Sequence, residues 1–221
     1  MSSIPLVVLG ALGNCLDIVD AALAGNKQGS EPAFEVLGYL DDEPSRQGIQ
    51  VRGFPVLGPL AMARDMPQAQ FVNGIGSSRS HRHKKSMIES LGLGLERFAT
   101  IVHPSAVIAS SATIGHGCVI MANATVCANV TLGNQVMMLP NCVVGHDSAI
   151  EDYSILAAGV TVSGVVKVGH SCYLGANSCI KEYVHMGEQA LLGMGAVAIK
   201  TIPANAVMVG NPARLLRQYD K

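Results

Sequence analysis

The sequence predicts a Rossmann-like α/β domain over residues 1–98 and a parallel β-helix with a short C-terminal tail over residues 99–221. Strand and helix signals alternate in the first half, which is typical of a small parallel sheet. A six-residue repeat then runs through the second half without interruption, and such a repeat indicates a solenoid. Because 49% of the 221 residues are hydrophobic, the chain can bury a substantial core.

The first half contains three apolar runs that we expect to form strands, at residues 4–9, 34–40 and 70–75. A helical pattern follows the first run, and a second helix is expected through Met87, Ile88 and Leu91. Alternation of this kind predicts parallel strands whose C-terminal ends face a ligand crevice.

Two features at those strand ends are candidates for nucleotide binding. The first strand leads into the G-x-x-G turn of Gly10 and Gly13, which lacks the full dinucleotide fingerprint and is weak evidence alone. The second strand ends at Asp41 and Asp42, where a carboxylate commonly meets a ribose hydroxyl. The alternative interpretation of both aspartates is a polar turn.

The charge pattern argues against several classes of partner. A formal net charge of −1 removes the electrostatic reason to expect a nucleic-acid or anionic-membrane binder. The basic run at residues 79–85, which contains Arg82, is more typical of a solvated loop or helix start than of an anion site. Neither a membrane-length apolar stretch nor signal-peptide features are present, which predicts a cytoplasmic protein without membrane insertion.

The cysteines do not form a recognisable chemical motif. None of them belongs to a C-x-x-C pair, and several occupy repeat positions that hold Ala, Val or Ser elsewhere. We therefore expect small buried apolar residues, and neither zinc ligands nor disulfides, at positions 15, 118, 127, 142, 172 and 179.

The second half is built from hexads. Sixteen consecutive repeats over residues 102–197 have Val, Ile, Leu or Met at the first position and Ala, Ser, Cys or Val at the fifth. One large aliphatic and one small inward residue per repeat fit a parallel β-helix with three hexads per coil. Residues eighteen apart should then be stacked neighbours, roughly 4.8 Å apart along the axis.

This period places His146 directly below Gly164. Both occupy third positions of their hexads, which lie at a corner of the prism. A glycine leaves its N–H approachable, and a histidine beside a donor can take a proton while the donor stabilises an oxyanion. His146 and Gly164 are therefore candidate catalytic residues, and the adjacent Asp147 is either the partner of the imidazole or a solvated corner acid.

Two other histidines share a different corner. His116 and His170 also occupy third positions and are 54 residues apart, and we interpret them as solvated or structural. No two histidines of this half have the i, i+4 or i, i+5 spacing of a metal pair, so we expect no metal site.

The hexads, together with IVHPSA at residues 101–106, VGHD at 144–147 and VGNPAR at 209–214, resemble the hexapeptide-repeat acyltransferases. The resemblance is closest to the sugar O/N-acyltransferases that modify nucleotide-linked amino sugars or sialic acid, and it covers nearly the whole chain. It implies a left-handed β-helix, an exception to the right-handed crossover rule, and a homotrimer with acetyl-CoA between adjacent prisms.

The resemblance also implies residue roles. His146 would be the general base, Asp147 would orient it, and Gly164 would offer its N–H to the thioester carbonyl. Coenzyme A contacts are implied at Gly193, Met194, Gly195, Gly210, Asn211 and Pro212. The nucleotide would bind at Gly10, Gly13 and Asp41 or Asp42, and Asn14 and Arg82 are further candidates for substrate contact.

Two positions depart from the family pattern. Family members usually have histidine at the positions of Asn14 and Ile155. The change at Asn14 affects substrate contacts, and the change at Ile155 removes a polar group from the expected acetyl-CoA groove. The predicted activity is N-acetylation of a nucleotide-linked amino sugar by direct transfer, since no cysteine has a nucleophile-like setting. The alternatives are a sugar O-acetyltransferase and a non-catalytic trimer that binds nucleotide sugar or coenzyme A.

Overall fold

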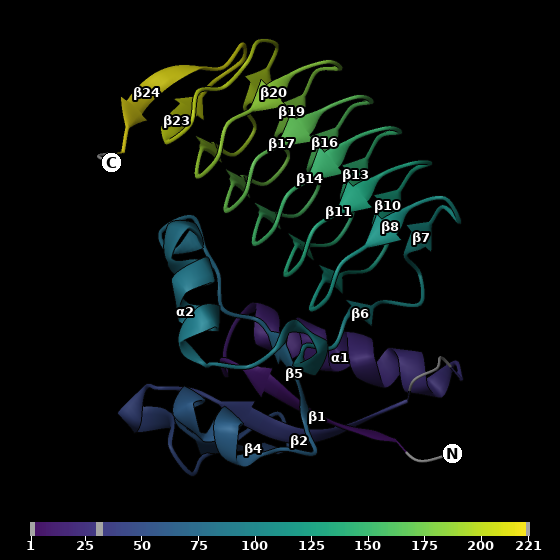
Figure 1. The fold of residues 1–221 in the computed structure, drawn as a ribbon, viewed down its shortest axis with the longest axis vertical. Helices are drawn as coiled ribbons and strands as arrows, with labels where there is room; N and C mark the ends of the chain where they lie inside the picture. The colour runs from purple at the N-terminus through teal and green to yellow at the C-terminus, as the bar shows by residue number, and fades with distance from the viewer. Residues whose placement is uncertain (1–2, 30–32, 220–221) are drawn as a thin grey trace.

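The computed structural model describes residues 3–29 and 33–219 and has two parts (Figure 1). The N-terminal part is a five-stranded sheet with helices, and a long prism of stacked coils rises from it toward the C-terminus. In the described part of the chain, no helix is long and apolar enough to cross a membrane.

The N-terminal sheet has the strand order β3-β4-β2-β1-β5. Strands β1, β2, β4 and β5 run parallel, and β3 pairs antiparallel with β4. Its elements, with η for short 3-10 helices, are β1 (Ile4–Leu9), α1 (Asn14–Lys27), β2 (Phe34–Leu40), η1 (Pro44–Arg46), β3 (Gln50–Val51), β4 (Phe54–Gly58), η2 (Leu60–Asp65), β5 (Gln70–Asn73), η3 (His81–His83), α2 (Lys84–Ser90) and η4 (Leu95–Arg97).

The sequence prediction of this sheet is incomplete in two places. It misses the β3–β4 hairpin, whose two-residue turn has positive φ at Arg52 and Gly53, as a type I′ turn requires. Arginine is unusual at that first position, so the turn signal was weak. The third predicted strand is also too long, because the side chain of Asn73 bonds both the N–H and the carbonyl of Ile75 and turns the chain away.

The second part is a left-handed parallel β-helix, which confirms the fold class expected from the repeat. The strands from β6 to β22 have two residues each, and they stack on three faces of a prism. Face 1 contains β6 (Ile101–Val102), β9 (Val119–Ile120), β12 (Met137–Met138), β15 (Ile155–Leu156), β18 (Tyr173–Leu174), β21 (Leu191–Leu192), β23 (Ala206–Val209) and the antiparallel β24 (Arg214–Gln218).

The other two faces consist only of two-residue parallel strands. Face 2 contains β7 (Val107–Ile108), β10 (Thr125–Val126), β13 (Val143–Val144), β16 (Thr161–Val162), β19 (Cys179–Ile180) and β22 (Val197–Ala198). Face 3 contains β8 (Thr113–Ile114), β11 (Thr131–Leu132), β14 (Ala149–Ile150), β17 (Lys167–Val168) and β20 (His185–Met186).

The pairing register confirms the eighteen-residue coil. Val144 pairs with Val126 on the coil below and with Val162 on the coil above, and the other strands follow the same spacing. The first-position aliphatic residues and fifth-position small residues point inward and form one continuous core. The inward Ser148 is compatible with that core because its hydroxyl donates to the Ser163 carbonyl and accepts from the Val166 N–H.

Most of the corners turn through a residue in the left-handed region. The fourth position of a hexad has positive φ at Asn123, Asn129, Asp147, Val165 and many equivalent residues. Asparagine and glycine tolerate this conformation well, whereas a β-branched valine is strained in it. The fourth position therefore directs its side chain differently from a residue on a flat strand.

The three faces differ in what covers them. The outward residues of face 1, including Val119, Met137 and Ile155, are buried against the N-terminal part. Face 2 presents Val107, Val143 and similar residues at the surface, and face 3 presents mainly polar side chains. One apolar face is therefore not covered by any element in the described part of the chain.

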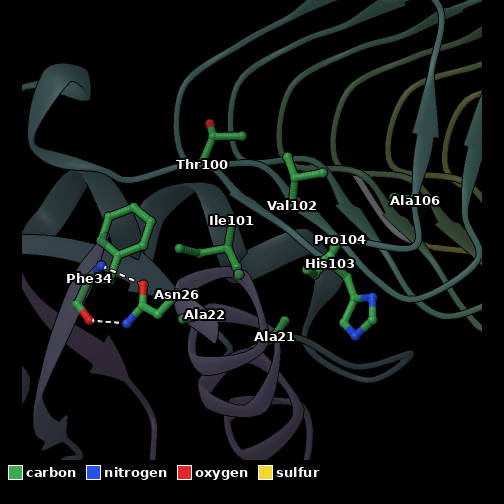
Figure 2. A pocket seen from close by; sticks show the side chains of 11 residues that line it. Ala21, Ala22, Asn26, Phe34, Thr100, Ile101, Val102, His103, Pro104 and Ala106 are labelled. Atoms are coloured by element: carbon green, nitrogen blue, oxygen red, sulfur yellow. Dashed lines mark hydrogen bonds between the residues drawn. The ribbon is translucent and has the colours of Figure 1, made fainter. Parts of the chain in front are cut away.

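The junction between the two parts contains a small hollow of about 280 Å³ between α1 and β6 (Figure 2). Its main polar group is already engaged, because the Asn26 side chain donates to the Phe34 carbonyl and accepts from the Phe34 N–H. His103 is likewise tied by Nδ1 to the N–H of Ser105. The hollow thus lies where α1 meets the first coil.

Candidate active site between the coils

His146 lies at the edge between faces 2 and 3, called here the His146 edge. The residue sits between β13 and β14 with 64% of its side chain exposed. Its Nδ1 is 2.8 Å from Oδ2 of Asp147. An ionised carboxylate can only accept, so Nδ1 must donate and Nε2 becomes the proton-accepting nitrogen.

The left-handed turn explains why two adjacent residues meet. Asp147 has φ 58°, so its side chain turns back toward His146 where a flat strand would direct it to the opposite side. From the sequence, Asp147 could be either a partner of the imidazole or a solvated acid. The structure shows the contact with the imidazole, although 49% of the Asp147 side chain remains exposed.

Gly164 lies one coil above His146 on the same edge, as the eighteen-residue period predicts. A Cβ placed on Gly164 would be 2.6 Å from Nε2 of His146, so the imidazole packs directly against the glycine. Among the described residues, neither Nε2 nor the Gly164 N–H has a hydrogen-bond partner. A proton acceptor and an N–H donor are therefore adjacent at the surface of one edge.

Asn129 completes this group, and the sequence analysis missed it. Its side-chain amide donates to Oδ1 of Asp147 at 3.0 Å from the coil below. The hydrogen bonds from His146 and, to a smaller extent, from Asn129 lower the pKa of the Asp147 carboxyl, so it is ionised at neutral pH. The eighteen-residue stack could have identified Asn129, because it occupies the position directly below Asp147.

The edge between faces 3 and 1, called here the His170 edge, also contains histidines. His170 Nε2 is 3.1 Å from Oε2 of Glu188, one coil above, and its Nδ1 faces the Ser171 hydroxyl. The N–H of His116 donates to Asn134. In the described parts of the chain, no group of three His, Cys, Asp or Glu side chains could hold a metal ion.

Four of the predicted substrate residues line one cleft. Gly10, Gly13, Asn14 and Asp41 surround a space of about 530 Å³ at the C-terminal ends of β1 and β2. The sequence missed Arg46 and the loop from Gly74 to Ser77, which complete its walls. The N-terminus of α1 opens into the cleft, and the side chain of Asn14 reaches Met137 on face 1.

Asp41 holds the wall of this cleft together. Its carboxylate accepts hydrogen bonds from the N–H groups of Glu43 and Ala11 and from the Arg46 guanidinium, at 2.9 Å each. Burial raises the pKa of the carboxyl, but these hydrogen bonds outweigh burial and hold the pKa below its usual value. Asp41 therefore fixes the G-x-x-G turn and the position of Arg46.

Two predicted substrate residues lie outside the cleft. Asp42 is exposed and accepts a hydrogen bond from the Leu60 N–H at the start of η2, which is the role of a capping residue. Arg82 donates to Gln189 and stacks over the ring of Tyr219, so it joins the N-terminal part to the last coils. Asp42 and Arg82 therefore do not line this cleft, and their contact with substrate stays a prediction.

The basic run is also less solvated than expected. His81 and Lys84 are buried, and Lys84 Nζ donates to the carbonyl of Gln135 on the His170 edge. Burial lowers the pKa of Lys84 to about 7. These two residues are part of the contact between the N-terminal part and the β-helix.

The predicted coenzyme A residues lie along the edge between faces 1 and 2, called here the Met194 edge. Gly193 and Met194 line a groove of about 560 Å³, and the Met194 side chain is 78% exposed. Gly210, Asn211 and Pro212 form the turn above them, where the Gly210 carbonyl accepts from the Val197 N–H. The groove is completed by residues that the sequence analysis missed: Ser78, Arg79, Tyr173, Gly175, Ala176, Leu191, Val207, Arg217 and Tyr219.

Ile155 does not line this groove. Its side chain is 1% exposed and belongs to the core shared by face 1 and the N-terminal part. A Cβ on Gly76 would lie 2.5 Å from its Cδ1, so Ile155 packs directly against the loop from Gly74 to Ser77 that lines the cleft. The sequence analysis placed residue 155 in the acetyl-CoA groove, whereas its buried side chain lies outside the groove at the Met194 edge.

The same loop lines both the cleft and the groove. Neither of them lies on the His146 edge. The segment from Gly74 to Ser77 lines the cleft, and Ser78 and Arg79 line the groove. Face 2 separates the Met194 edge from the His146 edge in a single chain. The predicted donor groove and the predicted base thus lie on different edges of one prism.

Four of the six cysteines are buried and unsuited to act as nucleophiles. All six are free, and Cys15, Cys118, Cys142 and Cys172 are buried. Burial raises the pKa of these thiols to about 11 or 12. The thiolate is the nucleophilic form, so none of these four is prepared for acyl transfer.

Comparisons with known proteins agree with this architecture. No protein-family model matches the chain. A UDP-N-acetylbacillosamine N-acetyltransferase of Bacillus subtilis (strain 168) is 41% identical over 61 residues, which cover 28% of this chain and 27% of that protein. The match thus spans about a quarter of the length of that relative.

Several solved structures resemble nearly the whole chain. A mutant perosamine N-acetyltransferase from Caulobacter crescentus, in complex with CoA and GDP-perosamine, has a TM-score of 0.84 at 23% identity and covers 96% of this chain and 97% of that one. WeeI from Acinetobacter baumannii AYE has a TM-score of 0.79 at 25% identity, with 96% and 99% covered.

The acetyltransferase domain of PglB from Neisseria gonorrhoeae FA1090 has a TM-score of 0.65 at 26% identity, with 97% and 100% covered. The same domain is also known in complex with acetyl coenzyme A. The chain thus resembles, as its hexads and motifs predict, the hexapeptide-repeat acyltransferases that include nucleotide-amino-sugar N-acetyltransferases.

Proposed function

We propose that the chain is an acetyl-CoA-dependent N-acetyltransferase that acetylates the amino group of a nucleotide-linked amino sugar. One observation carries the proposal: Nε2 of His146, held by Asp147, lies beside the unpaired N–H of Gly164 on an exposed edge. The likeness to proteins that bind CoA and GDP-perosamine supports the substrate class.

The chemistry that this arrangement supports is direct transfer. The neutral amine attacks the thioester carbonyl carbon, a C–N bond forms, and the carbonyl electrons move onto oxygen. The Gly164 N–H stabilises that oxyanion, and Nε2 of His146 takes the proton from nitrogen. The carbonyl then re-forms as the C–S bond breaks, and the imidazolium returns the proton to the departing thiolate.

The cleft of the N-terminal part is the proposed nucleotide site. The N–H groups at the start of α1 favour an anion such as a diphosphate, and Arg46 is held beside them by Asp41. Gly10 is required there because a Cβ would be 2.7 Å from Cys15 Sγ and 2.8 Å from Ile75 Cγ1. Through Asn14 and the Gly74–Ser77 loop, a bound sugar would be directed toward the β-helix.

The groove at the Met194 edge is the proposed acetyl-CoA site. Two arginines, Arg79 and Arg217, line it, and no acidic residue is among its described lining residues. The guanidinium groups suit the phosphates of the donor, and Leu191 and Met194 supply apolar surface for its pantetheine arm.

A single chain does not bring this groove to His146, so we propose that the active site forms between two copies in a homotrimer. Face 2 lies between the two edges and presents an uncovered row of Val and Thr side chains. A second copy covering this face would place its Met194 edge near the His146 edge of the first. A cytoplasmic location is part of the same proposal.

The test is acetyl-CoA-dependent thiol release with UDP-, GDP- and dTDP-linked amino sugars, followed by identification of the product. The proposal predicts thiol release with at least one amino sugar and an amide in the product. An ester product would instead identify a sugar O-acetyltransferase. Thermal stabilisation by acetyl-CoA and nucleotide sugar without any thiol release would identify a non-catalytic binding protein.

A further inference from the structure

Asn129 and Asp147 form a two-coil hydrogen-bonded stack that ends at His146. Both residues turn the corner in the left-handed region, with φ 58° each, so their side chains point along the same edge. Each carboxylate oxygen of Asp147 has its own partner: Asn129 Nδ2 at 3.0 Å on Oδ1 and His146 Nδ1 at 2.8 Å on Oδ2.

No other described side chain holds Asp147. The residue one coil above it, Val165, is apolar, so support comes only from below. Asn129 is itself fixed, because its N–H donates to the hydroxyl of Ser111 at 3.1 Å. An exposed carboxylate with several rotamers is thereby restricted to the one that meets the imidazole.

We propose that Asn129 is a positioning residue, which holds one oxygen of Asp147 so that the other keeps the His146 imidazole oriented with Nε2 over Gly164. The inference rests on the proposed function. It adds a residue that does not touch the reacting atoms and acts through Asp147.

The chain supplies a matched control on a different edge. Asn123 has φ 59°, its N–H is held by Ser105 at 3.1 Å, and its side chain donates to Asn141 one coil above at 3.4 Å. The Asn123 stack has the same corner geometry but ends on an amide without a catalytic histidine. Replacing either asparagine by glycine removes the side chain without straining the left-handed backbone.

We expect Asn129→Gly to reduce kcat by about 10-fold with unchanged KM for both substrates, as the loss of an outer orienting partner does. Asn123→Gly should leave kcat within about twofold of wild type. It should lower the melting temperature about as much as Asn129→Gly does, because each variant loses one stacked hydrogen bond. Equal effects of the two glycine variants on kcat would overturn the proposal.

A second variant tests whether the amide donor of Asn129, and not only the size of its side chain, is needed. Asn129→Asp keeps the size of the side chain but places a carboxylate against Asp147, so we expect at least the loss of kcat seen in Asn129→Gly. The added negative charge should also move the acid limb of the pH profile to higher pH. The other charged or titratable groups near this edge, Lys167, Lys181, Glu182 and His185, are the same in all variants. Wild-type kcat in Asn129→Asp would contradict the proposal.

A readout without turnover distinguishes failure of this inference from failure of the proposed function. The ¹⁵N shifts of the His146 imidazole report which nitrogen carries the proton, and we expect a smaller Nδ1-protonated fraction in Asn129→Gly but not in Asn123→Gly. If the wild-type protein releases no thiol with any amino sugar while this spectral change occurs, the proposed function is wrong and the positioning role stands. An unchanged spectrum in Asn129→Gly refutes the positioning role.

Discussion

The His146 edge and the His170 edge have the same backbone but opposite surroundings. Both histidines occupy the third position of a hexad beside a left-handed corner residue. His170 bonds Glu188 through Nε2 and lies beside α2 of the N-terminal part, which contributes Lys85 and Glu89 to the same hollow. His146 has only Nδ1 engaged and faces a glycine.

The difference shows that the residue one coil above decides what a corner histidine does. A glutamate above His170 engages its second nitrogen, whereas a glycine above His146 leaves that nitrogen and an N–H donor at the surface. The N-terminal part further covers the His170 edge by burying Lys84 against Gln135. A repeat fold therefore supplies similar corners, and local stacking leaves one of them with an unpaired imidazole nitrogen beside an N–H donor.

The largest expected difference between the two edges is in turnover. His146→Ala should lower kcat by about 10²–10⁴-fold, because it removes the proton acceptor. His170→Ala should leave kcat within about twofold, since its exposed pair with Glu188 contributes little. Steady-state kinetics of both variants measures this, and comparable losses would remove the distinction between the edges.

The burial of Lys84 against the His170 edge should affect how the free energy of unfolding depends on pH. Lys84 has a pKa lowered to about 7 by burial, against about 10.4 for an unfolded lysine. Between these values the unfolded chain binds more protons, so the free energy of unfolding should rise with pH. Lys84→Met should abolish this rise and stabilise the protein at pH 7 by about 1–4 kcal/mol.

Urea unfolding at pH 7 and pH 9.5 checks this expectation at a fixed protein concentration. Lys85→Met is the matched control, because Lys85 is half exposed and pairs only with Glu89. Wild-type and Lys84→Met curves that shift equally with pH would show that Lys84 is not buried by the N-terminal part.

Substituting two glycines at the His146 edge should affect catalysis and folding differently. A Cβ on Gly164 meets the movable imidazole at 2.6 Å, so Gly164→Ala should fold normally and lose about 10-fold or more in kcat. A Cβ on Gly145 meets the backbone carbonyl carbon of Ser163 at 2.6 Å, so Gly145→Ala should mainly lower the melting temperature. Equal loss of folding in both variants would make Gly164 purely structural.

The smallest expected effect concerns backbone strain on the same edge. Val165 has φ 58°, which is unfavourable for a β-branched residue, so Val165→Asn should stabilise the protein by about 1 kcal/mol. Thermal denaturation of Val165→Thr provides the comparison, because threonine keeps the branching and should bring no gain. A stabilisation by threonine equal to that by asparagine would contradict the strain argument.

The repeat made most of the prism predictable. The period of eighteen placed Gly164 above His146 and put His170 on another edge, because register in a solenoid follows directly from spacing. The same arithmetic predicts Asn129 below Asp147. The contact between Asp147 and His146 was not predictable, because it depends on a left-handed corner and not on strand alternation.

The remaining differences between prediction and structure come from contacts between the two parts. The burial of Ile155 and the position of Arg82 depend on which face the N-terminal part covers, and hydrophobic spacing within one domain does not contain that information. Asp41 lies at the strand-end cleft where the sequence placed it, but its hydrogen bonds to Ala11 and Arg46 could not be predicted, because they require the packed loop.

The most direct test of the shared active site is complementation between two inactive variants. His146→Ala removes the base, and Met194→Glu places a carboxylate in the groove proposed for the anionic donor. If base and groove come from different copies, refolding an equal mixture should restore about a quarter of wild-type activity, since random assembly pairs an intact base with an intact groove at that frequency. Activity no higher than that of the two variants assembled separately would show that the site is not shared between copies.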